Sequence, residues 1–462
     1  MARGKYQKRP RIGGLIAILI LVLLVFGGGL VMHYVDFAPD TPTPSESTLP
    51  TSTAAPTTEP TTEPTTEPTT EPTTEPTEPY VVTTASVGVT GDVLLHSPVY
   101  NDALNSKGEY DFSHMFTYIA EYYQRYDVMV ANMEGTLSGA DQGYSGYPAF
   151  NAPDSIVDAL KDAGVDMLLT ANNHTYDRGH KGLVRTQEVI SDRGLAHLGT
   201  RLSTDEPNYI VQDINGILVG MVSYTYETEK PAEDRKALNG ITVSRDDGSL
   251  INSFHAKYLD DFYAEVQLIL EAMYAEGAEA TMIYIHWGEE YQLQANSKQQ
   301  EIAQGLCELG VDVIVGGHPH VIQPFATLTS STGHQTYCIY SLGNALSNQR
   351  RENISQTPDG HCEDSMIFGV TFEKWNDGSV NVSVIDILPV WVSRDRNNSN
   401  VYYLIPLDLD VEDWTIYNEA SSVAYKYLKG SYKRTMCIVG EGYNACRTEL
   451  GLPEVPMTAD EK

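Results

Sequence analysis

Short apolar runs that end in polar residues recur along the middle of the chain. Each run is rich in β-branched or other apolar residues and is bounded by Gly, Asn or Pro, which is typical of a buried strand. Five of the runs end in carboxylate, amide or imidazole groups, and the last one ends in an uncharged amide. The runs span residues 87–92, 128–134, 167–174, 282–290, 311–320 and 338–344.

Stretches of helical character lie between these runs. All four lead directly into a glycine, which is a common signal for the C-terminus of a helix. Strands that alternate with helices predict an α/β sheet. The predicted helices are Ser155–Ala163, Leu183–Arg193, Tyr258–Glu276 and Lys298–Leu309.

The segments after the last polar tip have a different pattern. Ile367–Trp375 and Ser379–Leu388 alternate on either side of Asn376-Asp377-Gly378, which predicts a β-hairpin. These strands complete a second sheet, so the predicted architecture is a helix–sheet–sheet–helix sandwich. Residues 413–429 again have helical character.

The polar tips of the predicted strands are candidates for a common site. In α/β sheets ligands bind beyond the carboxyl ends of the strands, so we expect these tips to converge. Each residue alone has an ordinary explanation as a cap, a turn residue or a half-buried histidine. Five tips with metal-ligand side chains together predict a cation site. Its candidate ligands are Asp92, Glu134, Asn173, His286, His318 and His320.

The segment Gly316-Gly317-His318-Pro319-His320 is the most specific of these tips. Two imidazoles that are two residues apart project to the same side of an extended backbone. Pro319 between them fixes φ and removes one backbone donor. Neutral imidazole is the commonest protein ligand for transition metals, so the segment offers two nitrogen ligands in a stiff frame.

The motifs at the tips, taken in order, resemble the capsule-synthesis CapA family, also described as the poly-γ-glutamate synthesis (PgsA-like) proteins. This family is similar in fold to the calcineurin-like metallophosphoesterases. The resemblance covers roughly Ala85 to Leu388 and implies an α/β fold, a four-layer α/β/β/α sandwich over residues 80–392. Residues 393–462 are expected to be a C-terminal extension packed on or near that domain. The motifs are Gly91-Asp92, Asn132-Met133-Glu134-Gly135, Ala171-Asn172-Asn173-His174-x-x-Asp177-x-Gly179, His286-Trp287-Gly288-x-Glu290-Tyr291, Gly317-His318-Pro319-His320 and Ser341-Leu342-Gly343-Asn344.

The resemblance also implies roles for individual residues. Asp92 and His320 hold a first metal ion, Glu134 bridges two ions, and Asn173, His286 and His318 hold the second. His174 is the general acid near the leaving group. Glu290, with Glu289, is an acid/base group or orients an imidazole; the alternative is that one is solvated and the other caps a helix. Asn132, Asn172 and Asn344 are the predicted substrate-binding residues, and Asn344 has strand termination as its alternative.

The chain departs from the phosphoesterase pattern at Leu94, where a histidine ligand is expected. The first metal site thereby loses an imidazole. His96 either replaces the missing ligand or is an ordinary loop histidine near Pro98. The cofactor is therefore one divalent ion or two, and Mn, Fe and Zn all accept such nitrogen and oxygen ligands.

The N-terminal 79 residues read as a membrane anchor and a stalk. Residues 1–11 are basic, and residues 12–35 are apolar over a length sufficient to span a bilayer, so they predict an uncleaved signal anchor with a cytoplasmic tail. A cleaved signal peptide is the alternative. Residues 36–79 contain five tandem Thr-Thr-Glu-Pro units and have little to bury, which predicts a disordered stalk. The large C-terminal part is then extracytoplasmic.

The composition of the chain limits the classes of partner that it can bind. The chain has 30 Lys and Arg against 62 Asp and Glu, a formal net charge of −32, which argues against nucleic acid as a partner. Five cysteines at irregular spacing form no disulfide framework, although Cys437 and Cys446 either pair or stay free. The sequence contains no Gly-rich phosphate loop, zinc Cys-x-x-Cys motif or Gly-x-Ser-x-Gly motif.

Two functions follow from these features. The first is a membrane-anchored, metal-dependent hydrolase that acts on a cell-envelope polymer or phosphoester. The second is a non-catalytic factor that assembles or retains an anionic capsule or wall polymer, together with capsule-synthesis machinery. A purely structural adhesin is a third and weaker hypothesis, because it leaves the ligand-type tips without a role.

Overall fold

The computed structural model describes residues 78–228, 235–395, 400–411, 414 and 425–459. The predicted cytoplasmic tail and anchor, and the predicted stalk up to residue 77, lie outside these residues. Within the described part of the chain, no helix is long and apolar enough to cross a membrane.

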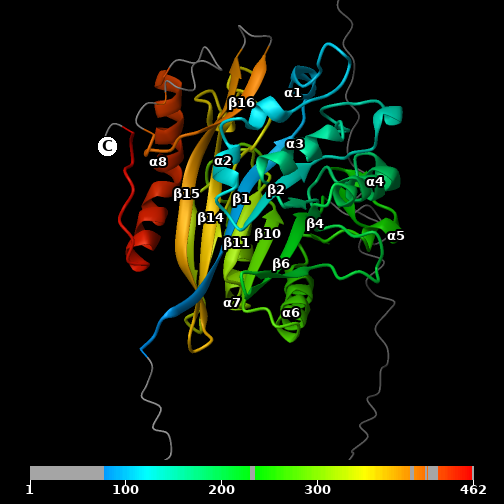
Figure 1. The fold of residues 1–462 in the computed structure, drawn as a ribbon. Coiled ribbons are helices and arrows are strands. Elements are labelled where there is room, and N and C mark those ends of the chain that lie inside the picture. The colour runs from blue at the N-terminus through cyan, green and yellow to red at the C-terminus, as the bar shows by residue number, and fades with distance from the viewer. Residues whose placement is uncertain (1–77, 229–234, 396–399, 412–413, 415–424, 460–462) are drawn as a thin grey trace, which may run out of the picture. The chain divides into compact units, whose positions relative to one another are not determined.

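The first sheet is built around β1 (Val81–Leu94), which is antiparallel to one neighbour and parallel to the other. On one side the strands run parallel, and on the other side they form antiparallel hairpins (Figure 1). The strand order is β16 (Val401–Pro406), β15 (Val380–Asp395), β14 (Asp364–Trp375), β1, β2 (Val128–Glu134), β3 (Met167–Leu169) and β4 (Ala196–Leu198).

The second sheet has a parallel centre and antiparallel edges. Its middle strand β10 pairs in parallel with β6 and β11, while β5 and β12 are antiparallel to their neighbours. The strand order is β12 (Phe325–Thr329), β13 (Gln335–Ile339), β11 (Val313–Gly317), β10 (Ala280–His286), β6 (Ile217–Tyr226) and β5 (Ile210–Ile214), and β9 (Ser253–Phe254) adds to the end of β6.

The two sheets pack face to face. Because successive side chains of a strand point to opposite faces, Val128 and Val130 of β2 enter the core between the sheets, whereas Met129 and Ala131 face outward. The outer face of the first sheet packs against α1 (Ser97–Asp102), η1 (Ser113–Phe116), α2 (Ala120–Tyr123), α3 (Ser155–Ala163) and α4 (Gly179–Asp192). The outer face of the second packs against α6 (Leu259–Ala275) and α7 (Ser297–Glu308). This is the predicted helix–sheet–sheet–helix layering.

The C-terminal part of the chain belongs to the same core. The predicted boundary after residue 392 falls inside β15, and α8 (Tyr425–Glu449) packs along the sandwich with Leu428, Tyr432 and Met436 buried between elements of both sheets (Figure 1). The boundary therefore does not separate two structural units. The predicted helix over 413–429 overlaps α8 only at its start, and most of 413–424 lies outside the described residues.

Helix α8 also settles the pairing of two cysteines. Cys437 and Cys446 both lie on this helix and are free. Nine residues of α-helix separate Cα atoms by about 13.5 Å, and a disulfide needs about 7 Å or less. The two thiols therefore cannot pair.

The predicted elements are found close to their expected bounds. The helix Ser155–Ala163 and the strand Val128–Glu134 are confirmed without change, and the hairpin at Asn376–Gly378 joins β14 to β15. These two strands extend the first sheet beside β1, so the prediction that they complete a second sheet is wrong. The hairpin of β5 and β6 had not been predicted, and β6 borders the candidate site. Smaller elements complete the fold: η2 (Ala140–Gln142), β7 (Ala237–Leu238), β8 (Ile241–Thr242), α5 (Arg245–Gly248) and η3 (His361–Glu363).

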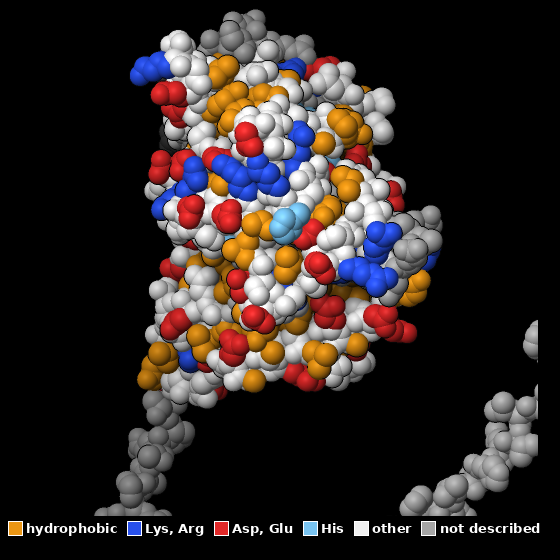
Figure 2. Space-filling model, turned by 90° about the vertical axis from the view of Figure 1, so that its right-hand side faces the viewer, with side chains coloured by type: hydrophobic (Ala, Val, Ile, Leu, Met, Phe, Trp, Pro, Cys, Tyr) orange, Lys and Arg blue, Asp and Glu red, His pale blue; other side chains and the backbone are white. Residues whose placement is uncertain are grey.

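Charge is unevenly distributed on the surface. Figure 2 shows the face on the side of α4, α5 and α6 in Figure 1. Acidic side chains are scattered over much of it, whereas Lys and Arg gather in a few patches. This distribution agrees with the strongly negative net charge of the chain.

Candidate metal centre

The carboxyl ends of the central strands meet at one end of the sandwich, as the sequence predicts. β1 and β2 bring Asp92 and Glu134 from the first sheet, and β10 brings His286 from the second. The loop after β11 adds His318 and His320. All five side chains are buried, with exposed fractions of 4% or less.

The two sheets come unusually close at this end. The N–H of Asp92 donates to the carbonyl of Gly343 at 3.1 Å, which joins β1 to the loop after β13. A Cβ atom on Gly91 would lie 2.0 Å from the Gly343 carbonyl oxygen, so only glycine fits there. This contact fixes Asp92 against the ligands from the second sheet.

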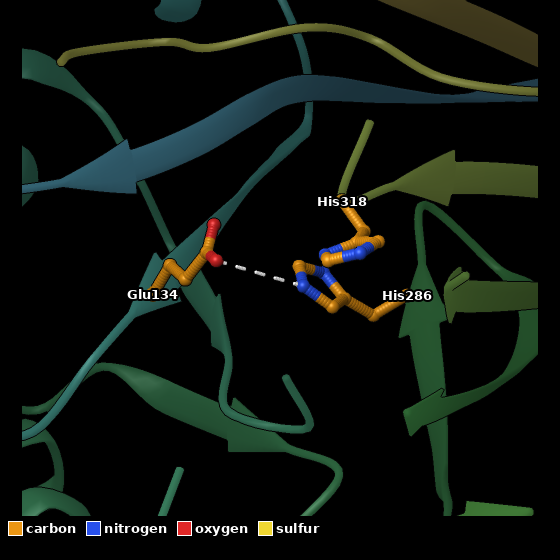
Figure 3. Close-up of side chains that lie close together, drawn as sticks. All are labelled: Glu134, His286 and His318. Atoms are coloured by element: carbon orange, nitrogen blue, oxygen red, sulfur yellow. Dashed lines mark ion pairs between the residues drawn. The ribbon is translucent and has the colours of Figure 1, made fainter. Parts of the chain in front are cut away.

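Glu134, His286 and His318 form one of two groups of ligand-type side chains (Figure 3). Their ligand atoms all lie within 4.8 Å of one another. His286 Nε2 lies 3.7 Å from Glu134 Oε1 and 2.8 Å from Asn173 Oδ1. The amide oxygen of Asn173 thus faces the same point as the imidazole of His286. The family resemblance implies that the second ion lies at this point.

Asp92, Glu134 and His320 form the other group. His320 Nδ1 lies 3.2 Å from Asp92 Oδ2, and His320 Nε2 lies 3.8 Å from Glu134 Oε1. Glu134 therefore belongs to both groups, which is the geometry expected of a bridging carboxylate.

The backbone around Pro319 differs from the prediction. His318 and His320 have φ values of 95° and 55°, in the left-handed region that L-residues seldom occupy. The segment is a tight turn and not an extended strand, because the chain must bend on both sides of Pro319 to aim each imidazole. The prediction that both rings project to the same side of an extended backbone is wrong, and each histidine joins a different group.

The groups also differ in electrostatics. Burial alone would lower the pKa of His320, but the carboxylates of Glu134 and Asp92 outweigh burial and raise it to about 9. Burial and the neighbouring imidazoles of His286 and His320 hold the pKa of His318 well below its usual range. Burial would raise the pKa of Glu134, but His320 and His286 outweigh this and lower it. Glu134 is therefore a carboxylate beside a neutral His318.

Unmet hydrogen-bonding capacity shows that the centre suits a cation. Both carboxylate oxygens of Glu134 and Nδ1 of His318 are buried without a hydrogen-bond partner. A buried carboxylate without partners is costly unless a cation or donor accompanies it. Carboxylate, amide and imidazole are ligands that Mn, Fe and Zn accept. The residues present therefore fit a divalent metal.

His174 lies beside this centre and is held by a residue whose role the sequence analysis did not assign. Nδ1 of His174 donates to Asp177 Oδ2 at 2.8 Å, and the ring packs edge-on against Phe150 at 4.7 Å between centroids. Asp177 Oδ2 also accepts from the Phe150 N–H at 2.7 Å. With Nδ1 so engaged, Nε2 of His174 is the nitrogen left for chemistry. The spacing of His174 and Asp177, three residues apart, was the available signal.

The three asparagines predicted to bind substrate are buried and bonded within the protein. Asn132 Nδ2 donates to Asp92 Oδ1 at 2.8 Å, and Asn172 Nδ2 donates to the Met133 carbonyl at 2.9 Å. Asn344 Nδ2 donates to Gln349 Oε1 at 2.9 Å and to the His320 carbonyl at 3.2 Å. Their amides position the ligands and the turn before His174, so this geometry does not support direct contact with substrate.

The position expected to hold a histidine ligand is apolar. Leu94 is 2% exposed and lies on the strand two residues after Asp92. His96 does not take its place among the two ligand groups. Its Nδ1 lies 3.2 Å from the Leu94 carbonyl, and burial lowers its pKa to about 4. The hypothesis that His96 replaces the missing ligand is not supported.

A cleft of about 470 Å³ opens next to His318. Its wall includes Glu290, which is exposed and belongs to neither ligand group, and its role as an acid/base group stays a prediction. Tyr226, at the end of β6, also lines the cleft, and its ring lies 4.7 Å from that of His318 between centroids. Glu227 follows it and lines the cleft. Neither Tyr226 nor Glu227 was predicted, because β6 itself had not been recognised.

The fold and the site together define an α/β protein with a buried centre of metal-ligand side chains at the carboxyl ends of strands from two facing sheets. Residues 86–349, more than half of the chain, match the family described as "Bacterial capsule synthesis protein PGA_cap". The chain belongs to this family, in agreement with the resemblance seen in the sequence.

Two curated relatives and one solved structure are similar to the chain. Capsule biosynthesis protein CapA of Bacillus anthracis is 27% identical over 268 residues, which cover 56% of this chain and 59% of that protein. PGA biosynthesis protein CapA of Bacillus subtilis (strain 168) is 27% identical over 244 residues, 52% of this chain and 56% of that protein. The match thus spans less than two thirds of either relative. NAD nucleotidase (NadN) of Haemophilus influenzae is 12% identical, with 80% of this chain and 68% of that chain covered and a TM-score of 0.39.

Proposed function

We propose that this chain is a metal-dependent hydrolase that acts on a capsule or other cell-envelope polymer, or on a phosphoester within it. The observation that carries the proposal is Glu134, a buried carboxylate shared by two ligand groups, with both oxygens unpartnered. A buried carboxylate that is shared by two ligand groups and accepts no hydrogen bond is explained by a cation that it binds. Membership of a capsule-synthesis family directs the proposal towards the cell envelope.

The residues of the centre would have distinct roles as metal ligands and as a proton donor. Asp92, Glu134 and His320 would hold one ion, and Glu134, Asn173, His286 and His318 would hold the other. Such ions, when bound, polarise the scissile bond and make water a better nucleophile at neutral pH. His174 would donate a proton from Nε2 to the leaving group, while Asp177 fixes the tautomer and the orientation of its ring.

The setting of the reaction is part of the proposal. Residues 12–35 would anchor the protein in the cell membrane as a single span, and residues 36–79 would hold the domain away from it on the extracytoplasmic side. The partners would be the membrane, an anionic capsule or wall polymer, and components of the capsule-synthesis machinery. Nucleic acid would not be a partner, because the net charge is −32.

Leu94 favours a second candidate function. An apolar side chain at this place deprives the Asp92 group of an imidazole, which weakens an arrangement meant to hold two ions. A centre with a single ion can bridge carboxylates of a polymer without activating water. The chain would then be a non-catalytic factor that assembles or retains the capsule polymer.

Hydrolysis assays decide between these functions. The metal-loaded chain is tested on bis-p-nitrophenyl phosphate, other phosphoesters and γ-glutamyl oligomers, with and without a chelator. His174→Ala removes the proton donor, and His180→Ala is the matched control, since His180 is a largely exposed histidine on α4. Metal-dependent turnover that His174→Ala abolishes and His180→Ala preserves supports the hydrolase. Tight polymer binding without hydrolysis of any substrate contradicts it and supports the assembly factor.

A further inference from the structure

The cleft beside His318 is lined by acidic and aromatic side chains. Glu227, Glu289 and Glu290 supply three carboxylates, and Tyr226 and Tyr291 supply aromatic rings. The only Lys or Arg among the described residues that line it is Lys298, whose ammonium group lies 2.6 Å from Glu301 Oε2. The negative charge of the cleft is therefore not neutralised from within.

Glu227 is a nearly buried residue of this cleft with one carboxylate oxygen that has no hydrogen bond. Its backbone N–H donates to the Phe254 carbonyl at 2.7 Å, which pins it between β6 and β9. Its Oε1 accepts from Ser253 Oγ at 3.0 Å, but Oε2 is buried without any partner. The residue is only 9% exposed. A rigid, nearly buried carboxylate with a free oxygen is suited to a cationic donor that enters from the cleft.

The carboxylates of the cleft are not gathered into a group of metal ligands. Among the described residues, only the two groups of the centre bring three ligand atoms within 4.8 Å of one another. Glu227, Glu289 and Glu290 are not such a group, so they are spread along the wall. Spread carboxylates with aromatic rings suit an organic ammonium group, which offers three donors and also binds to aromatic faces.

We propose that this cleft binds the terminal ammonium group of an amino-acid polymer and presents the end of that polymer to the metal centre. This inference rests on the proposed function. Interior units of a γ-glutamyl chain carry only carboxylates, which Glu227, Glu289 and Glu290 repel. The amino end is the one positive group of such a chain, so the cleft selects ends over interior segments.

Calorimetric titration of the 462-residue chain tests the inference. The probes are γ-glutamyl tetramers with a free amino end, the same tetramers acetylated at that end, and a glucosamine tetramer. We expect the free amine to bind at least about tenfold more tightly than the acetylated form, because a charge-assisted hydrogen bond is lost on acetylation. Glu227→Gln is expected to remove this preference and Glu289→Gln to reduce it. Glu271→Gln, an exposed control on α6, leaves it unchanged.

Each contrary outcome is clear. Equal binding of free and acetylated tetramers, or a preference that survives Glu227→Gln, overturns the ammonium subsite. Binding of the glucosamine tetramer as tight as that of the γ-glutamyl tetramer overturns the assignment to an amino-acid polymer. Binding and turnover are measured separately. A preference for the free amine without hydrolysis would contradict the proposed function and support the ammonium subsite. Hydrolysis without that preference would support the proposed function and contradict the subsite.

Discussion

Two buried clusters of charge in this molecule look similar in composition and differ in how their carboxylates are satisfied. Behind the loop that carries Asn344, Glu363 accepts from Arg351 Nε at 3.0 Å, and Asp364 accepts from Arg434 Nε at 2.7 Å and Ser431 Oγ at 2.6 Å. At the strand tips, Glu134 accepts no hydrogen bond at all.

The difference separates a structural cluster from a functional one. The arginine-paired carboxylates are complete without any ligand, so their role is to hold η3 and β14 against α8. Oε1 of Glu134 lies 3.7 Å from His286 and 3.8 Å from His320, but neither carboxylate oxygen accepts a hydrogen bond, so both are available to a metal ion. Burial alone thus does not mark a functional carboxylate, whereas burial with both oxygens unpartnered does.

The largest expected effect comes from Glu134→Gln. Turnover should fall about a thousandfold, because the polarisation supplied by bound metal is worth several kcal/mol. Initial rates measure this quantity. A variant that keeps full turnover would remove Glu134 from the site.

Glu363→Gln should lower the stability of the protein and leave its metal binding unchanged. Breaking a buried pair leaves Arg351 and Arg350 with an uncompensated charge, at a cost of about 3 kcal/mol in the free energy of unfolding at pH 7. Metal content should not change. Normal stability, or a loss of metal, would mean that the two clusters are not separate in function.

The same residue gives a pH dependence with a definite sign. Burial alone would raise the pKa of Glu363, but the bonds from Arg351 and the charge of Arg350 outweigh it and lower the pKa below its ordinary 4.5. Its contribution to stability is therefore present above pH 4.5 and is lost as the pH falls through the depressed pKa. Denaturation at a series of acidic pH values should show a shallower loss of stability in Glu363→Gln than in the parent chain.

Asp177→Asn should reduce turnover by about ten- to a hundredfold, a range typical for a residue that orients another. The asparagine fills the same space but supplies a neutral amide in place of the carboxylate that accepts from His174 Nδ1. Initial rates against substrate concentration should show a lower kcat with an unchanged KM, because the ring of His174 is held less firmly while the metal ligands stay intact. A kcat equal to that of the parent chain would contradict the positioning role of Asp177.

Leu94→His is the smallest and most specific test. An imidazole two residues after Asp92 lies on the same side of β1, so it should tighten the ion of the Asp92 group by about tenfold. Competition with a chromophoric chelator measures this affinity. If the second equivalent of metal binds no more tightly than in the parent chain, the weakness of this group has another cause.

Local patterns account for what the sequence could predict. The strand Val128–Glu134 and the helix Ser155–Ala163 follow from apolar periodicity and neighbouring turn signals, and the strand tips follow from the rule for parallel sheets. Contacts between distant segments could not be predicted from these local patterns. The sequence around Glu363 does not indicate that Arg351 pairs with it, and the sequence around His318 does not indicate its positive φ.

The hairpin of β5 and β6 was not predicted, although the sequence carries a clear signal for it. Ile210–Ile214 and Ile217–Tyr226 flank Asn215-Gly216, a turn signal as clear as the one at Asn376–Gly378. Tyr226 and Glu227, which shape the cleft, stand at the end of this hairpin and were not predicted without it.

The most direct test of the central claim is the metal content of the purified chain and of Glu134→Gln after equal loading with Mn, Fe or Zn. We predict about one to two ions per chain for the parent and a loss of most of that metal in the variant. Equal metal content in the two proteins, or none in the parent, would contradict the claim that Glu134 is kept unpartnered for a cation.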